Sequence, residues 1–219
     1  MKLTAAHRTG IALAVPTGLY AVSFGALGVA AGLSILQVQL LSLVMFTGGS
    51  QFAFVGALAG GPMTAAGSAV LLGVRNMVYG AEMNVLLRPR GLWVPLQAQM
   101  TIDESFAAAV AQDDLDEQRR AFWTAGVGIY LTWNTFTLVG SLLGAGLGDP
   151  KVIGLDGAAV AAFLGLLWPR LKNADAWLVA VVSAVATALT FPYLPAGVPL
   201  LVAAAVAAAL GIARKGGTR

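Results

Sequence analysis

The sequence predicts an all-α, polytopic membrane helical bundle, and its composition and charge pattern are the observations that predict it. Of the 219 residues, 58% are hydrophobic and 11% are charged, whereas a soluble domain carries about 25% charged residues. No charged side chain occurs in the 66 residues from Thr9 to Val74. About 20 apolar residues span the hydrocarbon core, so this run holds two helices and half of a third. A soluble globular enzyme is excluded, and residues 1–219 are expected to form one transmembrane domain.

Charged and turn-forming residues divide the chain into eight segments. The fourth segment is the most polar, so it either spans the membrane or dips in and returns, which gives eight or seven helices. In both cases the Lys and Arg side chains near the segment ends divide nine to three. The richer side, which includes the C-terminus, is expected in the cytoplasm. The two halves show no convincing internal repeat. The segments are Gly10–Ala31, Val38–Gly60, Met63–Leu87, Leu92–Ala111, Ala121–Leu147, Val152–Trp168, Ala176–Tyr193 and Val198–Ala213.

An interruption is expected inside the second segment, where Gly48 and Gly49 stand side by side and Gln51 follows. Each glycine disfavours a helix by about 1 kcal/mol. Transporters often break helices at the membrane midplane and expose backbone groups to the substrate there. These three residues are therefore candidate substrate-binding groups. The alternative is a kinked helix in which Gln51 is bonded to a neighbouring helix.

Charged side chains also occur inside the third and fourth segments. Arg75 lies near the middle of the third segment, and Tyr79 and Glu82 share its helix face at i+4 and i+7. Placing an Arg near the bilayer centre costs roughly 2.5–3.5 kcal/mol, so Arg75 needs a partner. It meets either a carboxylate that binds or moves during transport, or a static acid that ties two helices together. Asp103 and Glu104 hold a substrate ammonium or a coupling proton, or they cap a helix and pair with Arg75.

The fifth segment carries a stripe of polar and aromatic side chains at helical spacing. The stripe either lines a cavity or makes interhelical hydrogen bonds, and its members are Tyr130, Trp133, Asn134, Thr137 and Ser141. Glycines recur at helical spacing in the first and fifth segments, where they allow close helix packing. They form seams within the chain, faces for a partner or the border of a substrate path. The glycines are Gly18, Gly25, Gly32, Gly140, Gly144 and Gly148.

The numbers of cysteine and histidine residues limit the kinds of reaction and metal site that the chain could support. The chain has no cysteine and one histidine, His7. Thiolate chemistry, His-based metal clusters and His-based nucleophilic triads are excluded, so we expect no enzyme activity, no metal and no cofactor. The basic residues do not cluster, so no nucleic-acid partner is expected.

Together these motifs resemble the AzlC family of branched-chain amino-acid permeases, from about Val15 to Arg170. The order and spacing of the motifs carry the resemblance. One departure concerns the third segment: family members commonly read Asn-x-Arg-His where this chain has Gly73-Val74-Arg75-Asn76, so the flanking Asn and His are replaced. The matching motifs are Pro16-Thr17-Gly18, Phe24-Gly25, Gly32-Leu33-Ser34, Ser42, Gly49-Ser50-Gln51-Phe52, Arg75, Tyr79-Gly80, Asp103-Glu104-Ser105-Phe106, Tyr130-Leu131-Thr132-Trp133, Gly140, Gly144, Gly148-Asp149-Pro150, Gly154-Leu155-Asp156 and Ala162-Phe163.

The resemblance implies export of valine, leucine or isoleucine across the cytoplasmic membrane, together with a small membrane partner of the AzlD type. The residues are compatible with such a substrate. The Gly48–Gln51 break and Arg75 offer donors for a carboxylate, and Asp103, Glu104 or Glu82 offers an acceptor for an ammonium. The competing class is a channel or passive pore for another small solute. The coupling ion is not defined by the sequence, and a proton is the expected one.

Overall fold

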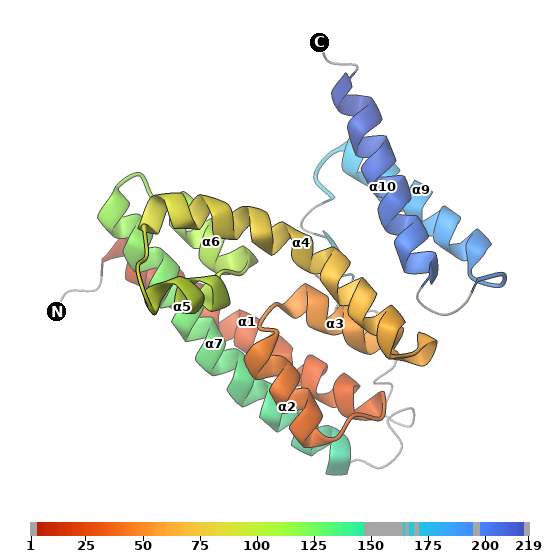
Figure 1. Ribbon diagram of the computed structural model, residues 1–219, viewed down its shortest axis with the longest axis horizontal. Helices are drawn as coiled ribbons and strands as arrows, with labels where there is room; N and C mark the ends of the chain where they lie inside the picture. The colour runs from red at the N-terminus through yellow and green to blue at the C-terminus, as the bar shows by residue number, and fades with distance from the viewer. Residues whose placement is uncertain (1–3, 147–163, 165–166, 169–170, 195–197, 217–219) are drawn as a thin grey trace.

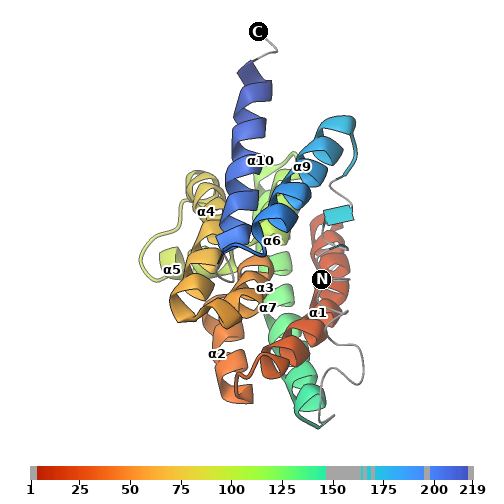
Figure 2. The same cartoon turned by 90° about the vertical axis from the view of Figure 1, so that its right-hand side faces the viewer.

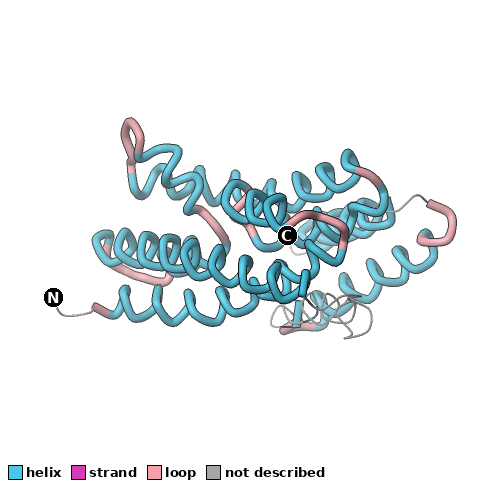
Figure 3. Tube along the Cα trace, turned by 90° about the horizontal axis from the view of Figure 1, so that it is seen from below, coloured by secondary structure: helices cyan, strands magenta, loops and turns pink. Residues whose placement is uncertain are grey.

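The computed structural model describes residues 4–146, 164, 167–168, 171–194 and 198–216. All regular structure within these residues is helical (Figures 1 and 3), so the predicted all-α class is confirmed. The sixth predicted segment, Val152–Trp168, falls mostly outside the described residues. The helices are α1 (Ala5–Ala30), α2 (Ile35–Val44), α3 (Gly48–Ala57), the 3₁₀ turn η1 (Leu58–Gly60), α4 (Pro62–Leu87), α5 (Trp93–Met100), α6 (Asp103–Val110), α7 (Leu115–Gly146), α9 (Ala174–Thr190) and α10 (Val198–Gly216).

Helix length separates three long helices of the bundle from four short ones. Among the described residues, α1 alone is both long and apolar enough to cross a membrane by the measure of length and composition. Helices α4 and α7 are of similar or greater length, but α4 contains Arg75 and Glu82 and α7 begins with acidic residues. Shorter apolar helices are α2, α9 and the Val202–Ile212 part of α10.

Helices α1 and α7 lie side by side and run in the same direction. The backbone N–H of Ala6 contacts Glu117 near the beginnings of the two helices, and Ala26 contacts Gly144 near their ends. The close contact along the whole length explains why both helices carry glycines at regular spacing, because small residues let helix backbones approach each other.

Four of the predicted stripe glycines, Gly18, Gly25, Gly140 and Gly144, form a seam inside this chain. Gly32 lies beyond the end of α1 with open space around it, and Gly148 lies outside the described residues. A Cβ atom on Gly25 would collide with the carbonyl oxygen of Thr137 and lie 2.6 Å from the backbone nitrogen of Ser141. Gly140 and Gly144 face α1 in the same way. The hypothesis that Gly25 and Gly144 offer faces to a partner subunit is therefore wrong, because the other helix already covers them.

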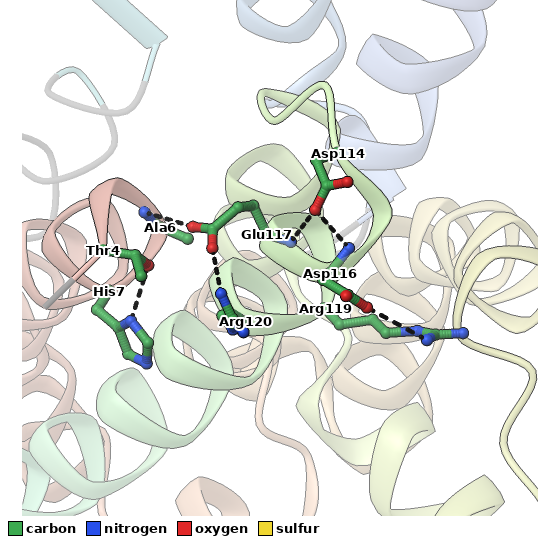
Figure 4. Close-up of polar contacts among 8 residues, drawn as sticks. All are labelled: Thr4, Ala6, His7, Asp114, Asp116, Glu117, Arg119 and Arg120. Carbon is green, nitrogen blue, oxygen red and sulfur yellow. Dashed lines mark hydrogen bonds and ion pairs between the residues drawn. The ribbon is translucent and has the colours of Figure 1, made fainter. Parts of the chain in front are cut away.

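A polar cluster joins the beginnings of α1 and α7 (Figure 4). The Glu117 carboxylate accepts a hydrogen bond from the Ala6 N–H at 3.4 Å and pairs with Arg120. The Thr4 hydroxyl, more than Arg120 or the Ala6 N–H, lowers the pKa of Glu117 against the opposing effect of desolvation. The Thr4 hydroxyl also lies 2.9 Å from Nδ1 of His7. A carboxylate at this position complements the positive end of the α1 dipole.

The predicted interruption of the second segment is confirmed, because α2 ends at Val44 and α3 begins at Gly48. The chain reverses at this break. Nε2 of Gln51 donates to the carbonyl oxygen of Leu41 at 3.1 Å, although residues ten apart in a straight helix are separated by about 15 Å. Helices α2 and α3 therefore form a re-entrant hairpin, with its tip inside the bundle.

The Leu92–Ala111 segment forms a second re-entrant hairpin, made of α5 and α6. At the start of α5, Trp93 packs against Trp123 near the beginning of α7, with ring centroids 5.7 Å apart. The end of α6 reaches the same end of α7 through a short connection. The tip lies deeper, where Met100 contacts Gly126. Of the two alternatives for this segment, the structure has the one in which it dips in and returns.

The two hairpins belong to units of the same design that run in opposite directions (Figure 1). Helix α1 is followed by the α2–α3 hairpin, and helix α4 is followed by the α5–α6 hairpin. Both long helices have 26 residues. Both units lie between Ala5 and Val110, within about the first half of the chain, so the two halves of the sequence do not correspond to the two units. Helices α9 and α10 pack mainly on each other and stand apart from this arrangement in Figure 1, and in Figure 2 they face the viewer.

Candidate functional site

The tips of both hairpins meet at one cavity, which α1, α4 and α7 also line. Its volume is about 230 Å³, somewhat below the 300–1,000 Å³ typical of sites for drug-sized ligands. Six of the nine predicted site residues line it. The lining residues are Thr17, Tyr20, Phe46, Thr47, Gly48, Gly49, Leu72, Arg75, Ile102, Asp103, Glu104, Ile129, Trp133 and Leu167.

An ion pair crosses the cavity between α4 and the second hairpin. Nη2 of Arg75 lies 2.8 Å from Oδ2 of Asp103, and the two side chains are 28% and 26% exposed. Of the alternatives for Arg75, the structure shows a pair with an acid of the chain itself. The pair uses one oxygen of the carboxylate. Nε of Arg75 and Oδ1 of Asp103 are buried and have no hydrogen-bond partner among the described residues. Each partner thus keeps one atom that a bound molecule could use.

The first turn of α3 forms another wall of the cavity. Its N-cap residue, Thr47, makes no capping hydrogen bond with its side chain, and the first N–H groups of a helix have no partner within the helix. Because Gly48 and Gly49 have no side chains, the backbone of this turn is left uncovered on the cavity side. A Cβ on Gly48 would lie 3.0 Å from the Trp133 ring, and one on Gly49 would lie 2.6 Å from Nη2 of Arg75. Any larger residue here would therefore press on the groups that line the cavity.

Aromatic rings support the side of the cavity next to α3. The Tyr20 ring lies 5.0 Å from Phe52 and 5.9 Å from Trp133 between centroids, and Phe24 packs edge-on against Phe52. The Tyr20 hydroxyl and the Trp133 indole N–H are buried without a hydrogen-bond partner among the described residues. Leaving such a group unpaired costs about 1–3 kcal/mol, so these two donors are candidates for contact with a ligand.

Three predicted site residues lie away from the cavity. Gln51 is fully buried and donates to the α2 carbonyl of Leu41, so it holds the hairpin together. The Tyr79 ring stacks on Phe106 at 4.4 Å. Asn134 lies against Gln39 of α2. Their placement favours structural roles for all three residues. For Gln51 it favours the alternative stated above, in which the side-chain amide is bonded to a neighbouring helix.

The stripe on α7 mostly makes interhelical hydrogen bonds. The Tyr130 hydroxyl donates to the Leu43 carbonyl oxygen, and the Ser42 hydroxyl donates to Oγ1 of Thr137 at 3.2 Å. Trp133 is the exception, because it lines the cavity. In the part of the chain that the structure describes, no three acidic or His side chains are grouped to hold a metal ion.

Comparison with known proteins identifies the family. The family model described as "AzlC protein" matches residues 12–147, which contain most of α1, all of α2 to α7 and all but one of the cavity residues. The chain belongs to the AzlC family. This AzlC family is a transport-related family of membrane proteins, and a membrane location follows for this chain.

Two relatives of this AzlC chain are named as membrane proteins. An "Uncharacterized membrane protein" of Archaeoglobus fulgidus is 30% identical over 216 residues, which cover 96% of this chain and 95% of the relative. The "Inner membrane protein YgaZ" of Escherichia coli K12 is 30% identical over 159 residues, 69% of this chain and 62% of the relative. No solved structure matches the chain.

Eight of the residues that line the AzlC cavity were not among the predicted site residues, and three of them show why. Thr17 and Tyr20 come from α1, which looked uniformly apolar, and Ile102 comes from the tip of the second hairpin. A signal existed for the pair in α1, because their i, i+3 spacing places two hydroxyl groups on one face of a predicted span. Ile102 carries no such signal, since its position depends on the chain reversal.

Proposed function

We propose that this protein is a secondary transporter that exports the branched-chain amino acids valine, leucine and isoleucine, as the large subunit of a two-component system. The observation that carries the proposal is the cavity at the meeting point of two oppositely directed hairpins. It places a cation, two acids and a bare helix N-terminus around apolar walls. Transporters with inverted repeats bind substrates at the interface of the repeats, often at broken helices.

The walls of the cavity suit a small zwitterion with an aliphatic side chain. Donors and acceptors are both present, and Leu72, Ile102 and Ile129 supply apolar surface. A pore for an uncharged solute would not need opposed charges beside a bare helix terminus. The cavity therefore favours the amino-acid transporter over the channel-like alternative.

The two hairpins support a membrane topology with six crossings and both termini in the cytoplasm. Because each hairpin returns to the side from which it enters, the crossings among the described helices are α1, α4, α7, α9 and α10. The sixth is the Val152–Trp168 segment, which is expected from the sequence alone. All basic residues but two then lie on one side, with Lys151 opposite and Arg75 within the membrane, in accord with the positive-inside rule. The cytoplasmic group comprises Lys2, Arg8, Arg88, Arg90, Arg119, Arg120, Arg170, Lys172, Arg214, Lys215 and Arg219.

Single cysteines can test this topology, since the natural chain has none. We expect Ala31→Cys and Ala59→Cys to react with a membrane-impermeant maleimide added from outside the cell. Both positions are exposed and flank the first hairpin. A variant with a cysteine at Gln112, beside the second hairpin, should react only after permeabilisation. If Ala31→Cys and Ala59→Cys react from opposite sides, the second segment crosses the membrane and the proposed topology is wrong.

Protons are the proposed coupling ion, with Asp103 or Glu104 as the carrier. Protonation of Asp103 would remove its attraction to Arg75, so pair formation and proton binding compete for one carboxylate. Asp103→Asn and Glu104→Gln should each change the pH dependence of flux. Unchanged profiles in both variants would remove these residues from coupling.

The proposed partner is a small AzlD-type membrane subunit. The α1–α7 glycine seam is covered within the chain, so the partner would contact another surface. Co-expression, purification and flux measurement with and without the partner test this part. Full leucine export by the isolated, monodisperse chain would overturn the two-component proposal.

A proteoliposome assay tests the function itself. Purified protein should release preloaded radiolabelled leucine, unlabelled valine and isoleucine should compete, and lysine and glutamate should not. Arg75→Gln should abolish flux while the protein still inserts and purifies, because the variant removes the charge without adding bulk. Near-normal leucine flux in Arg75→Gln would remove Arg75 from the mechanism. Flux without competition would favour the passive pore.

A further inference from the structure

We propose that Tyr20 and Trp133 are substrate-binding residues that donate hydrogen bonds to a carboxylate seated on the first turn of α3. This inference rests on the proposed function and deepens it, since it assigns an end of the cavity to the carboxylate of the substrate. Tyr20 belongs to α1, Trp133 to α7 and the α3 turn to the first hairpin, so three separate elements would converge on one ligand group.

The donors are held in place by packing. Trp133 is only 3% exposed, yet its indole N–H has no partner among the described residues. Its ring is fixed between Gly48 and the rings of Tyr20 and Phe24. The Tyr20 ring is held by Phe52, its hydroxyl has no partner among the described residues, and Tyr20 lines the same cavity as Trp133. Buried donors are normally satisfied, so the two groups together indicate that an acceptor is missing.

The nearest backbone adds donors. Gly48 and Gly49 are the first two residues of α3, a helix of ten residues, and Thr47 does not cap it with its side chain. Free N–H groups and the helix dipole make such a terminus attractive to anions. A Cβ on Gly48 would lie 3.0 Å from Cη2, at the edge of the Trp133 ring, and Trp133, Tyr20 and the first turn of α3 line the same cavity. A carboxylate there could accept hydrogen bonds from side chains and backbone at once.

The acids lie on a different element from these donors. Asp103 and Glu104 occupy the first turn of α6, the tip of the second hairpin, and Oδ1 of Asp103 has no partner among the described residues. One hairpin thus presents donors and the other presents acceptors. An α-amino acid would lie with its carboxylate toward the first hairpin and its ammonium toward the second. The free carboxylate, and not the amine alone, would determine which molecules bind.

Leucine and leucinamide test the assignment, because the amide keeps the ammonium and the side chain but has no carboxylate. The measurement is the dissociation constant of each compound for the purified full chain in detergent, taken from the rise of its unfolding temperature with ligand concentration. We expect the wild type to bind leucine at least tenfold more tightly than leucinamide. Tyr20→Phe, which removes one hydroxyl, should weaken leucine binding about tenfold and leave leucinamide unchanged.

Tyr130→Phe is the matched control, because it removes a hydroxyl that bonds the Leu43 carbonyl outside the cavity lining. It should leave the ratio of the two dissociation constants unchanged. Trp133→Phe provides a second test that should reduce the ratio in the same way as Tyr20→Phe. If either cavity variant weakens leucine and leucinamide equally, or changes neither, the assignment is wrong.

The same measurement separates this assignment from the branched-chain proposal. A panel of the standard amino acids identifies the best ligand of the wild type. If that ligand is not branched-chain, the proposed function fails, and the Tyr20 assignment is judged on that amino acid and its amide. If no amino acid stabilises the wild type, the carboxylate site is overturned as well.

Discussion

Replacing Gly49 with alanine would disturb the ion pair of the cavity without disturbing the fold. The added methyl group would lie 2.6 Å from Nη2 of Arg75, 3.5 Å from its Cζ and 3.6 Å from Cδ2 of Leu72. The nearest atom is the end of a flexible side chain, so the guanidinium can move aside. Restoring an ordinary contact requires a shift of nearly 1 Å, as judged from hydrogen-bond and packing distances.

That shift affects the contact with Asp103, because the displaced nitrogen is the one that lies 2.8 Å from the carboxylate. A hydrogen bond to a charged group contributes about 1.5–3 kcal/mol, and 1.4 kcal/mol corresponds to a factor of ten. We therefore expect Gly49→Ala to lower leucine flux in proteoliposomes at least tenfold. Stability should not fall, because alanine favours a helix over glycine by up to about 1 kcal/mol.

Gly56→Ala is the control for this prediction. Gly56 lies in the same helix, and a Cβ there would meet nothing within 4 Å. This variant should gain the helix preference and keep wild-type flux. Unfolding temperature and flux are measured together for both variants. If Gly49→Ala transports as well as Gly56→Ala, the position of Arg75 does not matter to transport and the reasoning about this site is refuted.

Three further predictions concern stability. Gly25→Ala should lower the yield of folded protein and its unfolding temperature, because overpacking a rigid seam costs about 1–3 kcal/mol; Gly80→Ala, which has open space around it, should be tolerated. Gln51→Leu should lower the free energy of unfolding by about 0.5–1.5 kcal/mol, since the carbonyl of Leu41 loses one of its two donors and keeps the Met45 N–H, and flux per folded molecule should persist. The lowered pKa of Glu117 means that its ionised form stabilises the fold at neutral pH, and this stabilisation is lost as the pH falls below the unfolded-state value of about 4.3. Plots of unfolding temperature against pH should therefore be steeper in that acidic range for the wild type than for Glu117→Gln, and identical slopes would contradict the role of this carboxylate.

Much of the fold was accessible from local features of the sequence. The adjacent glycines at 48 and 49 predicted the break between α2 and α3, because helix propensity is a local property. Arg75 required an acid for energetic reasons, and Asp103 was among the acids available inside the apolar part of the chain. Trp133 and the glycines were identified by helical spacing, although spacing did not tell which neighbour they face.

The remaining features depend on chain reversal, which leaves little trace in composition. A re-entrant hairpin and a spanning helix bury similar residues, so Val38–Gly60 looked like one span. Gln51 stood out as polar, but whether its amide meets a substrate or the Leu41 carbonyl depends on the direction in which α3 runs. Tyr20 was missed for a related reason: its neighbour Phe52 comes from α3, whose placement follows from the first hairpin.

The parallel pairing of α1 with α7 has a consequence for the synthesis and membrane insertion of the chain. The contacting residues Ala6 and Glu117 are 111 positions apart in the chain, and translation adds about 5–20 residues per second. Helix α1 thus waits roughly 6–22 seconds before its main neighbour begins to emerge. During that interval the glycine face of α1 can contact only lipid or the insertion machinery. The nascent chain is expected to be most open to quality-control proteolysis in this window, and chains truncated before α7 should be degraded even though α1 and the first hairpin are complete.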